Sequence, residues 1–231
     1  MPADAPAPAG TTSSIPRHRP YRFLALLITE LALILGFPFT AGGDIRFHLY
    51  RVLAIMVFAA ALYAVLGRGR ITAIAFLLGM PAIVVHFENA MGFLERLQMQ
   101  ALMLGIVFLV FVTGVFIWSV LSDPSVTADT LAGAVSAYLL VGITYGLAYW
   151  MIEQLAPGSF RQTVEPGTSI KPTDYVFFSF VTLTTLGYGD IVPWGGHAKS
   201  VAITEAVIGI MYPAVLIGRL IGLHGIKRSQ S

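Results

Sequence analysis

Residues 182–190 read Thr-Leu-Thr-Thr-Leu-Gly-Tyr-Gly-Asp, and long apolar segments flank them at about 131–152 and 198–222. A further apolar run at 173–184 leads into this stretch but is too short to cross a hydrocarbon core about 30 Å thick. Non-helical backbone is tolerated at membrane depth only where protein buries it or water wets it. A short helix and a glycine-containing loop between two spanning helices therefore predict a re-entrant segment that lines an aqueous path.

The loop at 185–189 suits the coordination of a cation by backbone oxygens. Gly187 and Gly189 reach, without steric cost, the backbone angles that turn successive carbonyl groups toward one axis. The Thr185 hydroxyl would add a further oxygen at the inner end. We expect the Tyr188 ring to point away from the axis and to pack against aromatic neighbours. These expected neighbours are Phe177, Phe178 and Trp194.

A helix through 173–184, with Thr173 or Asp174 as its N-cap, would direct its partially negative end toward the membrane centre, where it favours a cation. The sequence has no cysteine, which excludes thiolate ligands. Its five histidines are scattered and form no ligand pair at helical spacing. The remaining oxygen ligands suit a hard cation that is held without thiolate or imidazole.

The segment resembles the signature of the tetrameric potassium channel superfamily, in which four Thr-Val-Gly-Tyr-Gly loops replace the hydration shell of K⁺ with carbonyl oxygens. Leu186 stands where valine is commonest. The resemblance is specific over about 131–222 and only architectural before it. It implies a selectivity filter at 185–189, with permeant K⁺ and no organic cofactor. The implied K⁺ sites are formed by Thr185, Leu186, Gly187 and Tyr188.

The resemblance also implies residues that support the filter, namely Thr184, Asp190, Phe177, Phe178 and Val181. Many family members carry a Trp-Trp pair, a glutamate or both behind the filter, as partners for the aspartate after Gly-Tyr-Gly. Phe177, Phe178 and Val181 occupy those positions here, so Asp190 lacks these partners within its own pore helix. We therefore expect a filter that is less firmly braced and prone to closing during prolonged opening.

The composition, with 56% hydrophobic and 11% charged residues, is typical of a membrane protein. We predict an all-α fold of six transmembrane helices, with a re-entrant pore helix and filter loop between the fifth and the sixth. The predicted spans lie at about 21–37, 45–66, 71–87, 100–121, 131–152 and 198–222. A competing interpretation of the first span is a secretory signal, with a passable cleavage site at 39–41.

The predicted organisation has four parts. A proline-rich segment at 1–20 reads as a disordered cytoplasmic tail. A four-helix membrane domain without gating charges follows at 21–121, then the pore domain at 129–222 and a short cytoplasmic tail at 223–231. Six crossings place both termini on one side, and the basic residues of the first loops favour the cytoplasmic side. We expect an integral, multi-pass protein of a prokaryotic inner membrane.

The expected gating follows from the fourth predicted helix, which carries no charge. Moving one charge across 100 mV supplies about 2.3 kcal/mol, so an uncharged helix cannot be driven by voltage. We predict a channel without steep voltage dependence. The sequence after Gly222 is too short for a regulatory domain, so gating would come from lipid, protons, small molecules or a separate subunit.

In the last predicted helix, Gly209 and Pro213 are candidates for a hinge, and Ile210 and Ile217 for lining a cavity or inner gate. Close helix packing is the alternative, because glycine is common at tight membrane crossings. Two glutamates, Glu30 and Glu205, fall within predicted spans. For both, we favour structural hydrogen bonding over proton sensing.

Taken together, the residues and the resemblance predict a subunit of a homotetrameric, potassium-selective channel that conducts K⁺ passively. The alternatives are a non-conducting or regulatory membrane subunit, and a subunit of an active K⁺ uptake system. No nucleophile, base pair or phosphate-binding loop suggests an enzyme. The basic residues sit singly at helix ends, so we expect membrane lipids rather than nucleic acid as partners.

Overall fold

The computed structural model describes residues 22–36, 44–67, 69–91, 98–122, 127–164 and 167–229. The predicted tail at 1–20, the alternative cleavage site at 39–41 and the last two residues of the predicted tail at 223–231 lie outside these ranges. The described elements are α1 (Arg22–Leu35), α2 (Asp44–Val65), α3 (Arg70–Met91), α4 (Gln98–Ser122), α5 (Ala128–Leu155), β1 (Phe160–Gln162), α6 (Pro172–Leu183), β2 (Ile191–Pro193) and α7 (Gly196–Ser229).

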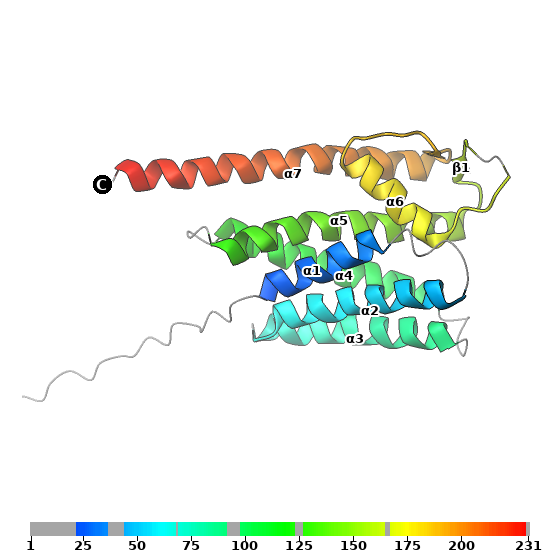
Figure 1. The fold of residues 1–231 in the computed structure, drawn as a ribbon, viewed down its shortest axis with the longest axis horizontal. Helices are drawn as coiled ribbons and strands as arrows, with labels where there is room; N and C mark the ends of the chain where they lie inside the picture. Colours follow the sequence, from blue (N-terminus) through cyan, green and yellow to red (C-terminus); the bar gives the residue numbers. More distant parts are fainter. Residues whose placement is uncertain are drawn as a thin grey trace, which may run out of the picture.

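Helix α5 lies at the centre of the fold, with α1–α4 on one side and α6 and α7 on the other (Figure 1). On the first side, α1 packs against α2 and α5, α3 packs between α2 and α4, and α4 returns to α5. Aromatic pairs join these helices, with the Phe23 ring edge-on to Phe116 at 5.0 Å and Phe58 stacked on Phe108 at 5.6 Å. These rings belong to one buried apolar core.

Three helices of the described chain are long and apolar enough to cross a membrane. The qualifying stretches are Leu102–Ser122 of α4, Ala128–Leu155 of α5 and Gly196–Gly222 of α7. Shorter apolar stretches occur at Val52–Val65 of α2 and Arg70–Val84 of α3. The protein is therefore mostly helical, with several membrane-capable helices.

Helix α7 extends further than the sequence indicated. It runs to Ser229, whereas the prediction ended the helix at 222 and assigned 223–231 to a tail. Pro213 lies within it. Because proline has no N–H and disfavours the helical conformation of the preceding residue, it marks a probable helix boundary in sequence, yet the helix continues on both sides here.

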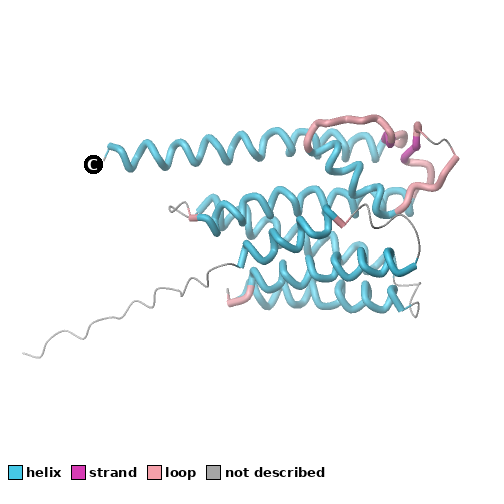
Figure 2. The backbone as a smooth tube through the Cα atoms, in the orientation of Figure 1, coloured by secondary structure: helices cyan, strands magenta, loops and turns pink. Residues whose placement is uncertain are grey.

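Two short strands depart from the all-α prediction. β1 and β2 pair antiparallel, with Phe160 opposite Pro193 and Gln162 opposite Ile191. Runs of three residues carry no periodic signal that distinguishes a strand from a loop. Figure 2 shows that the backbone between α6 and β2 is loop. The strand pair therefore ties the chain before α6 to the chain that follows this loop.

Candidate functional site

Helix α6 begins two to three residues earlier than the predicted caps. Lys171 is the N-cap and Pro172 the first helical residue, so Thr173 and Asp174 lie inside the helix, and the predicted N-cap was wrong. The Lys171 N–H donates to the Asp174 carboxylate at 2.8 Å. Proline suits the first helical position, and an acidic residue at the third can reach back to the cap. Asp174 thus stabilises the helix start from within the first turn.

The 185–189 loop is hydrogen-bonded to the last turn of α6. After Leu183 the backbone leaves the helix, and the N–H groups of Leu186 and Gly187 both donate to the Val181 carbonyl, at 2.9 and 3.2 Å. The Thr185 N–H donates to Thr182 at 3.0 Å. Val181 thus contacts the loop through its backbone. The sequence analysis had treated this position only as one that lacks the usual side-chain partner for Asp190.

These hydrogen bonds fix the direction of the carbonyl groups. In a trans peptide the C=O and N–H point in opposite directions, and no described peptide is cis. Because the N–H of Leu186 points back at Val181, the Thr185 carbonyl of the same peptide points away from α6. The Leu186 carbonyl does the same, since the N–H of Gly187 also bonds Val181. Two consecutive carbonyl oxygens therefore face away from their own helix.

The backbone angles alternate along the loop. Thr185, Gly187 and Gly189 have positive φ values of 59°, 60° and 75°, and Leu186 and Tyr188 between them do not. Left-handed and right-handed residues in alternation cancel the helical rotation, which keeps successive carbonyls on one side. Glycine reaches positive φ freely, but a β-branched residue does so only under strain. Sequence reasoning predicted this geometry at the two glycines and missed Thr185.

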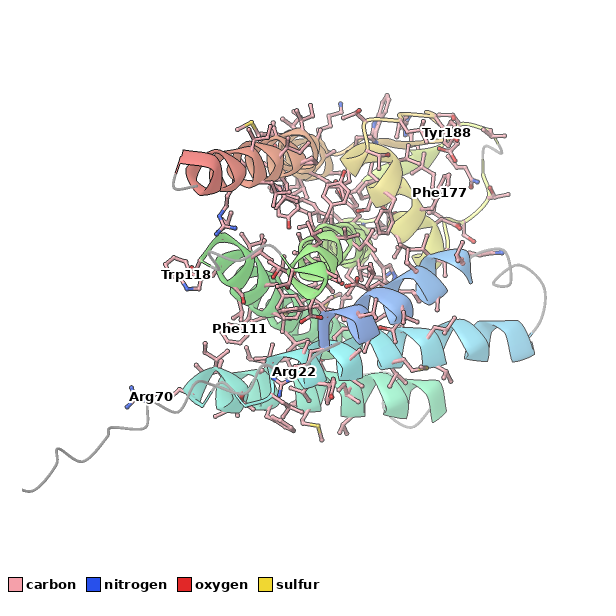
Figure 3. The ribbon with its side chains drawn as sticks, turned by 60° about the vertical axis from the view of Figure 1, so that its left-hand side comes forward. Arg22, Arg70, Phe111, Trp118, Phe177 and Tyr188 are labelled. Atoms are coloured by element: carbon pink, nitrogen blue, oxygen red, sulfur yellow. The ribbon has the colours of Figure 1, made fainter. Side chains whose placement is uncertain are left out.

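An aromatic stack covers the middle of the loop. The Tyr188 ring lies parallel to the Phe177 ring of α6, with 6.2 Å between centroids and 9° between planes (Figure 3). Of the expected neighbours, Trp194 instead lies under the Arg161 guanidinium, 3.6 Å from its ring centroid. Phe178 packs edge-on against Tyr149 at 5.0 Å. Phe177 is therefore the neighbour that braces Tyr188.

The outer end of the loop is held by Thr163, which the sequence analysis did not identify. Its hydroxyl donates to the Gly189 carbonyl at 2.5 Å, and its N–H donates to the Asp190 carbonyl at 2.8 Å. The Asp190 carboxylate accepts a hydrogen bond from the backbone of Ile191 at 3.0 Å. The residue that holds the end of the loop thus comes from the chain just after β1, a link visible only once the strands are paired.

Behind α6, a cluster of rings fastens the helix to its neighbours. Phe160 of β1 lies edge-on to Tyr149, Tyr175 and Phe178 at 5.4, 5.3 and 5.5 Å. Edge-to-face contacts at this spacing are favourable beyond the apolar area that they bury. Phe178, predicted as a filter support, therefore acts here from the rear of α6.

The C-terminus of α6 is seated directly on α7. A Cβ atom added at Gly209 would lie 1.9 Å from the Leu183 carbonyl oxygen, so only glycine permits this approach. The Tyr138 hydroxyl of α5 donates to the same oxygen at 3.2 Å. The structure thus gives Gly209 a close packing contact, which is the alternative that the sequence left open beside the hinge.

The other predicted positions on α7 are half-buried or exposed in the single chain. Pro213 is half-buried, whereas the side chains of Ile210 and Ile217 are 61% and 56% exposed in the single chain. Of the membrane-length window of α7, only 11% is buried, against 61% for α5. Most of this apolar helix therefore has no cover within its own chain.

Glu30 and Glu205, the two glutamates within predicted spans, differ in their surroundings. Glu205 of α7 is fully buried and is hydrogen-bonded to the Tyr149 hydroxyl of α5 and the Ser179 hydroxyl of α6. Glu30 of α1 is also fully buried, but among the described residues its carboxylate oxygens make no hydrogen bond. The structural hydrogen bonding expected for both glutamates is thus present at Glu205 and, among the described residues, not at Glu30.

Comparison with known proteins identifies the same region. Residues 137–223 match the family described as "Ion channel". The chain is 33% identical over 85 residues to "Two pore potassium channel c" of Oryza sativa subsp. japonica, an alignment that covers 37% of this chain and 17% of that one. It is 36% identical over 78 residues to "Inward rectifier potassium channel Kirbac3.1" of Paramagnetospirillum magnetotacticum, covering 34% of this chain and 24% of that one.

The chain thus spans less than a quarter of the length of these two potassium channels. It covers more of "Protein LctB" of Bacillus caldotenax, to which it is 30% identical over 98 residues, or 40% of this chain and 71% of that one. No solved structure matches. The matched proteins indicate a channel and not an enzyme. From the site geometry and these matches, this chain is a membrane protein that belongs to the ion channel family.

Proposed function

We propose that this chain is one subunit of a potassium-selective channel, in which the 185–189 loop conducts K⁺ passively. The observation that carries the proposal is the direction of the Thr185 and Leu186 carbonyls. Both N–H groups of these peptides bond the Val181 carbonyl, which leaves the carbonyl oxygens on the opposite side, free of α6. Carbonyl oxygens in this arrangement can replace the hydration shell of K⁺.

The partial charges of α6 favour a cation near the loop. The helix ends at Leu183, two residues before Thr185, so its partially negative end lies beside the first carbonyls. The Thr185 hydroxyl would add a ligand at the inner end. We assign the K⁺ sites to Thr185, Leu186, Gly187 and Tyr188, with Gly189 completing the filter.

A fourfold homotetramer would complete the site. One chain supplies one loop, and residues 184–189 are all exposed in it, including Leu186 at 55% and Tyr188 at 66%. Exposed apolar side chains at these positions need cover from another surface. The uncovered face of α7 gives the subunits a second surface for contact. A ring of four copies would close around one axis, as cyclic oligomers do.

The wider architecture is also part of the proposal. We infer six crossings with both termini cytoplasmic, surrounded by lipid, in a prokaryotic inner membrane. Helix α4 carries no charged residue between Gln98 and Ser122, which supports conduction without steep voltage dependence. Gating would then come from a ligand, from lipid, or from a separate regulatory subunit.

The test is K⁺ flux into liposomes that hold the purified protein, with Na⁺ substituted in parallel. Gly187→Ala places a side chain at a φ of +60° and should abolish selective flux. Gly114→Ala in α4 is the matched control, because an added Cβ there meets no atom within 4 Å. Equal K⁺ and Na⁺ flux, or selective flux that survives Gly187→Ala, would contradict the proposal. Absence of flux in every sample would favour the regulatory-subunit alternative.

A further inference from the structure

Glu205 lies where three helices of the pore region meet. It belongs to α7, it is fully buried, and its two oxygens contact Ser179 of α6 and Tyr149 of α5. Both partners are hydroxyl groups and not cationic side chains. Burying an ionised carboxylate without a cationic partner is costly. The protonation state of Glu205 therefore depends on which neighbouring groups carry a proton to donate.

The number of available protons points to a neutral Glu205. The Ser179 oxygen lies within hydrogen-bonding distance of two acceptors, the Gly142 carbonyl at 2.6 Å and the nearer oxygen of Glu205. A serine hydroxyl carries one proton, and a carbonyl carries none. If Ser179 donates to Gly142, the contact with Glu205 needs a proton from the glutamic acid itself. The second Glu205 oxygen accepts from Tyr149.

This network contacts α6 on both sides of Val181, the residue whose carbonyl accepts the hydrogen bonds from the loop. Ser179 precedes Val181 and Leu183 follows it, and Val181 is the acceptor for Leu186 and Gly187. Glu205 bonds Ser179, and Gly209, one turn later on α7, contacts Leu183. Two successive turns of α7 therefore fix the segment of α6 that carries the Val181 carbonyl.

We propose that Glu205, as a neutral hydrogen-bond donor to Ser179 and acceptor from Tyr149, is a positioning residue for the filter. It acts through α6 and does not itself contact the ion. This inference rests on the proposed channel function. It also supplies a brace from the rear of α6, where Val181 stands in place of the glutamate that many family members have.

Two conservative variants separate this role from a role of the negative charge. Glu205→Gln is neutral and equally long, so its amide can donate to Ser179 while its oxygen accepts from Tyr149. Glu205→Asp keeps a carboxylate but is one methylene shorter and cannot reach both hydroxyls. The matched control is Glu30→Gln, which changes the other glutamate that is fully buried among the described residues and which belongs to α1.

The measurement is the ratio of K⁺ to Na⁺ flux in liposomes, with the oligomer checked by size-exclusion chromatography. We expect Glu205→Gln and Glu30→Gln to keep the ratio within about twofold of wild type, and Glu205→Asp to lower it about tenfold, the scale of one lost buried hydrogen bond. Ser179→Ala should lower the ratio as Glu205→Asp does.

The outcomes separate this inference from the channel proposal. Wild-type protein without K⁺ selectivity would overturn the channel function and this inference with it. Selective wild-type flux combined with an unchanged ratio in Glu205→Asp would overturn the positioning role alone. A ratio lost in Glu205→Gln and kept in Glu205→Asp would show that the negative charge matters, and would equally overturn the neutral form.

Discussion

At the scale of single residues, the 185–189 loop is fixed at both ends by its own chain. The Val181 carbonyl holds the N–H groups of Leu186 and Gly187 at the inner end, and Thr163 holds the Gly189 carbonyl at the outer end. Between these ends, the Tyr188 ring rests on Phe177. The loop can therefore keep its carbonyls aligned although its side chains are exposed in the single chain.

Thr163→Val tests the hydrogen bond that holds the outer end of the loop. Valine keeps the shape of threonine but removes the hydroxyl that donates to the Gly189 carbonyl. We expect faster decline of K⁺ current in low external K⁺, with a destabilisation of about 1 kcal/mol from the lost hydrogen bond. Thr168→Val is the control, because the Thr168 hydroxyl donates to the Gln162 side chain and not to the loop. Equal rates of decline in the two variants would contradict this role of Thr163.

At the scale of elements, the position of α6 depends on α7 as much as on its own sequence. Leu183 can lie against α7 only because residue 209 has no side chain. Ten residues further along α7, the Arg219 guanidinium donates to the Val120 carbonyl in the last turn of α4. A cation at a helix C-terminus is favourable because it meets unpaired carbonyls and the negative end of the helix dipole. Helix α7 therefore links α6 to the first four helices.

Gly209→Ala should destabilise the folded protein by about 1–3 kcal/mol or more. The added Cβ would lie 1.9 Å from the Leu183 oxygen, so α6 or α7 would have to move, and forced repacking costs about 1–3 kcal/mol or more. Thermal unfolding in detergent measures the effect. Gly218→Ala on the same helix is the control, because its added Cβ meets nothing within 4 Å. A melting temperature unchanged in Gly209→Ala would show that the two helices do not pack this closely.

Arg219→Gln tests the link between α7 and α4. The shorter neutral side chain loses the charged donor to the Val120 carbonyl, which should lower stability by about 1–2 kcal/mol. Arg70→Gln is the control, since Arg70 is exposed at the start of α3 (Figure 3). Thermal unfolding of the two variants provides the comparison. If Arg70→Gln lowered the melting temperature as much, a general charge effect would replace the specific link.

The limits of the sequence prediction follow from which contacts are local. Hydropathy located α4, α5 and α7, and glycine chemistry located Gly187 and Gly189, because both signals lie within one segment. Thr185 was missed as a positive-φ residue, since its β-branched side chain disfavours that conformation and only the surrounding hydrogen bonds impose it. Thr163 and the contact at Gly209 depend on segments far apart in sequence, and no local pattern marks them.

At the scale of the whole molecule, burial is uneven. Helix α5 is enclosed by its own chain, whereas α7 and the 185–189 loop are largely uncovered. A monomer would leave this apolar surface without cover, and four copies around one axis would use both features at once. The uncharged α4 would then act as a packing helix among the first four helices, because it has no charge on which a membrane voltage could act.

The conductance of the assembled channel should therefore depend weakly on voltage. Because α4 carries no charge, this helix cannot couple gating charges to opening, as the fourth helix of a voltage sensor would. Macroscopic current recorded over a range of voltages in planar bilayers measures this dependence. A steep, saturating conductance-voltage curve would contradict the expectation.

The most direct test of the central claim is the reversal potential of single channels in a planar bilayer, with K⁺ on one side and Na⁺ on the other. A filter formed by the 185–189 loops predicts a reversal potential displaced strongly toward the K⁺ equilibrium value, and loss of unitary currents in Gly187→Ala. A reversal potential near zero would show that the pore does not distinguish the two ions, and would contradict the account.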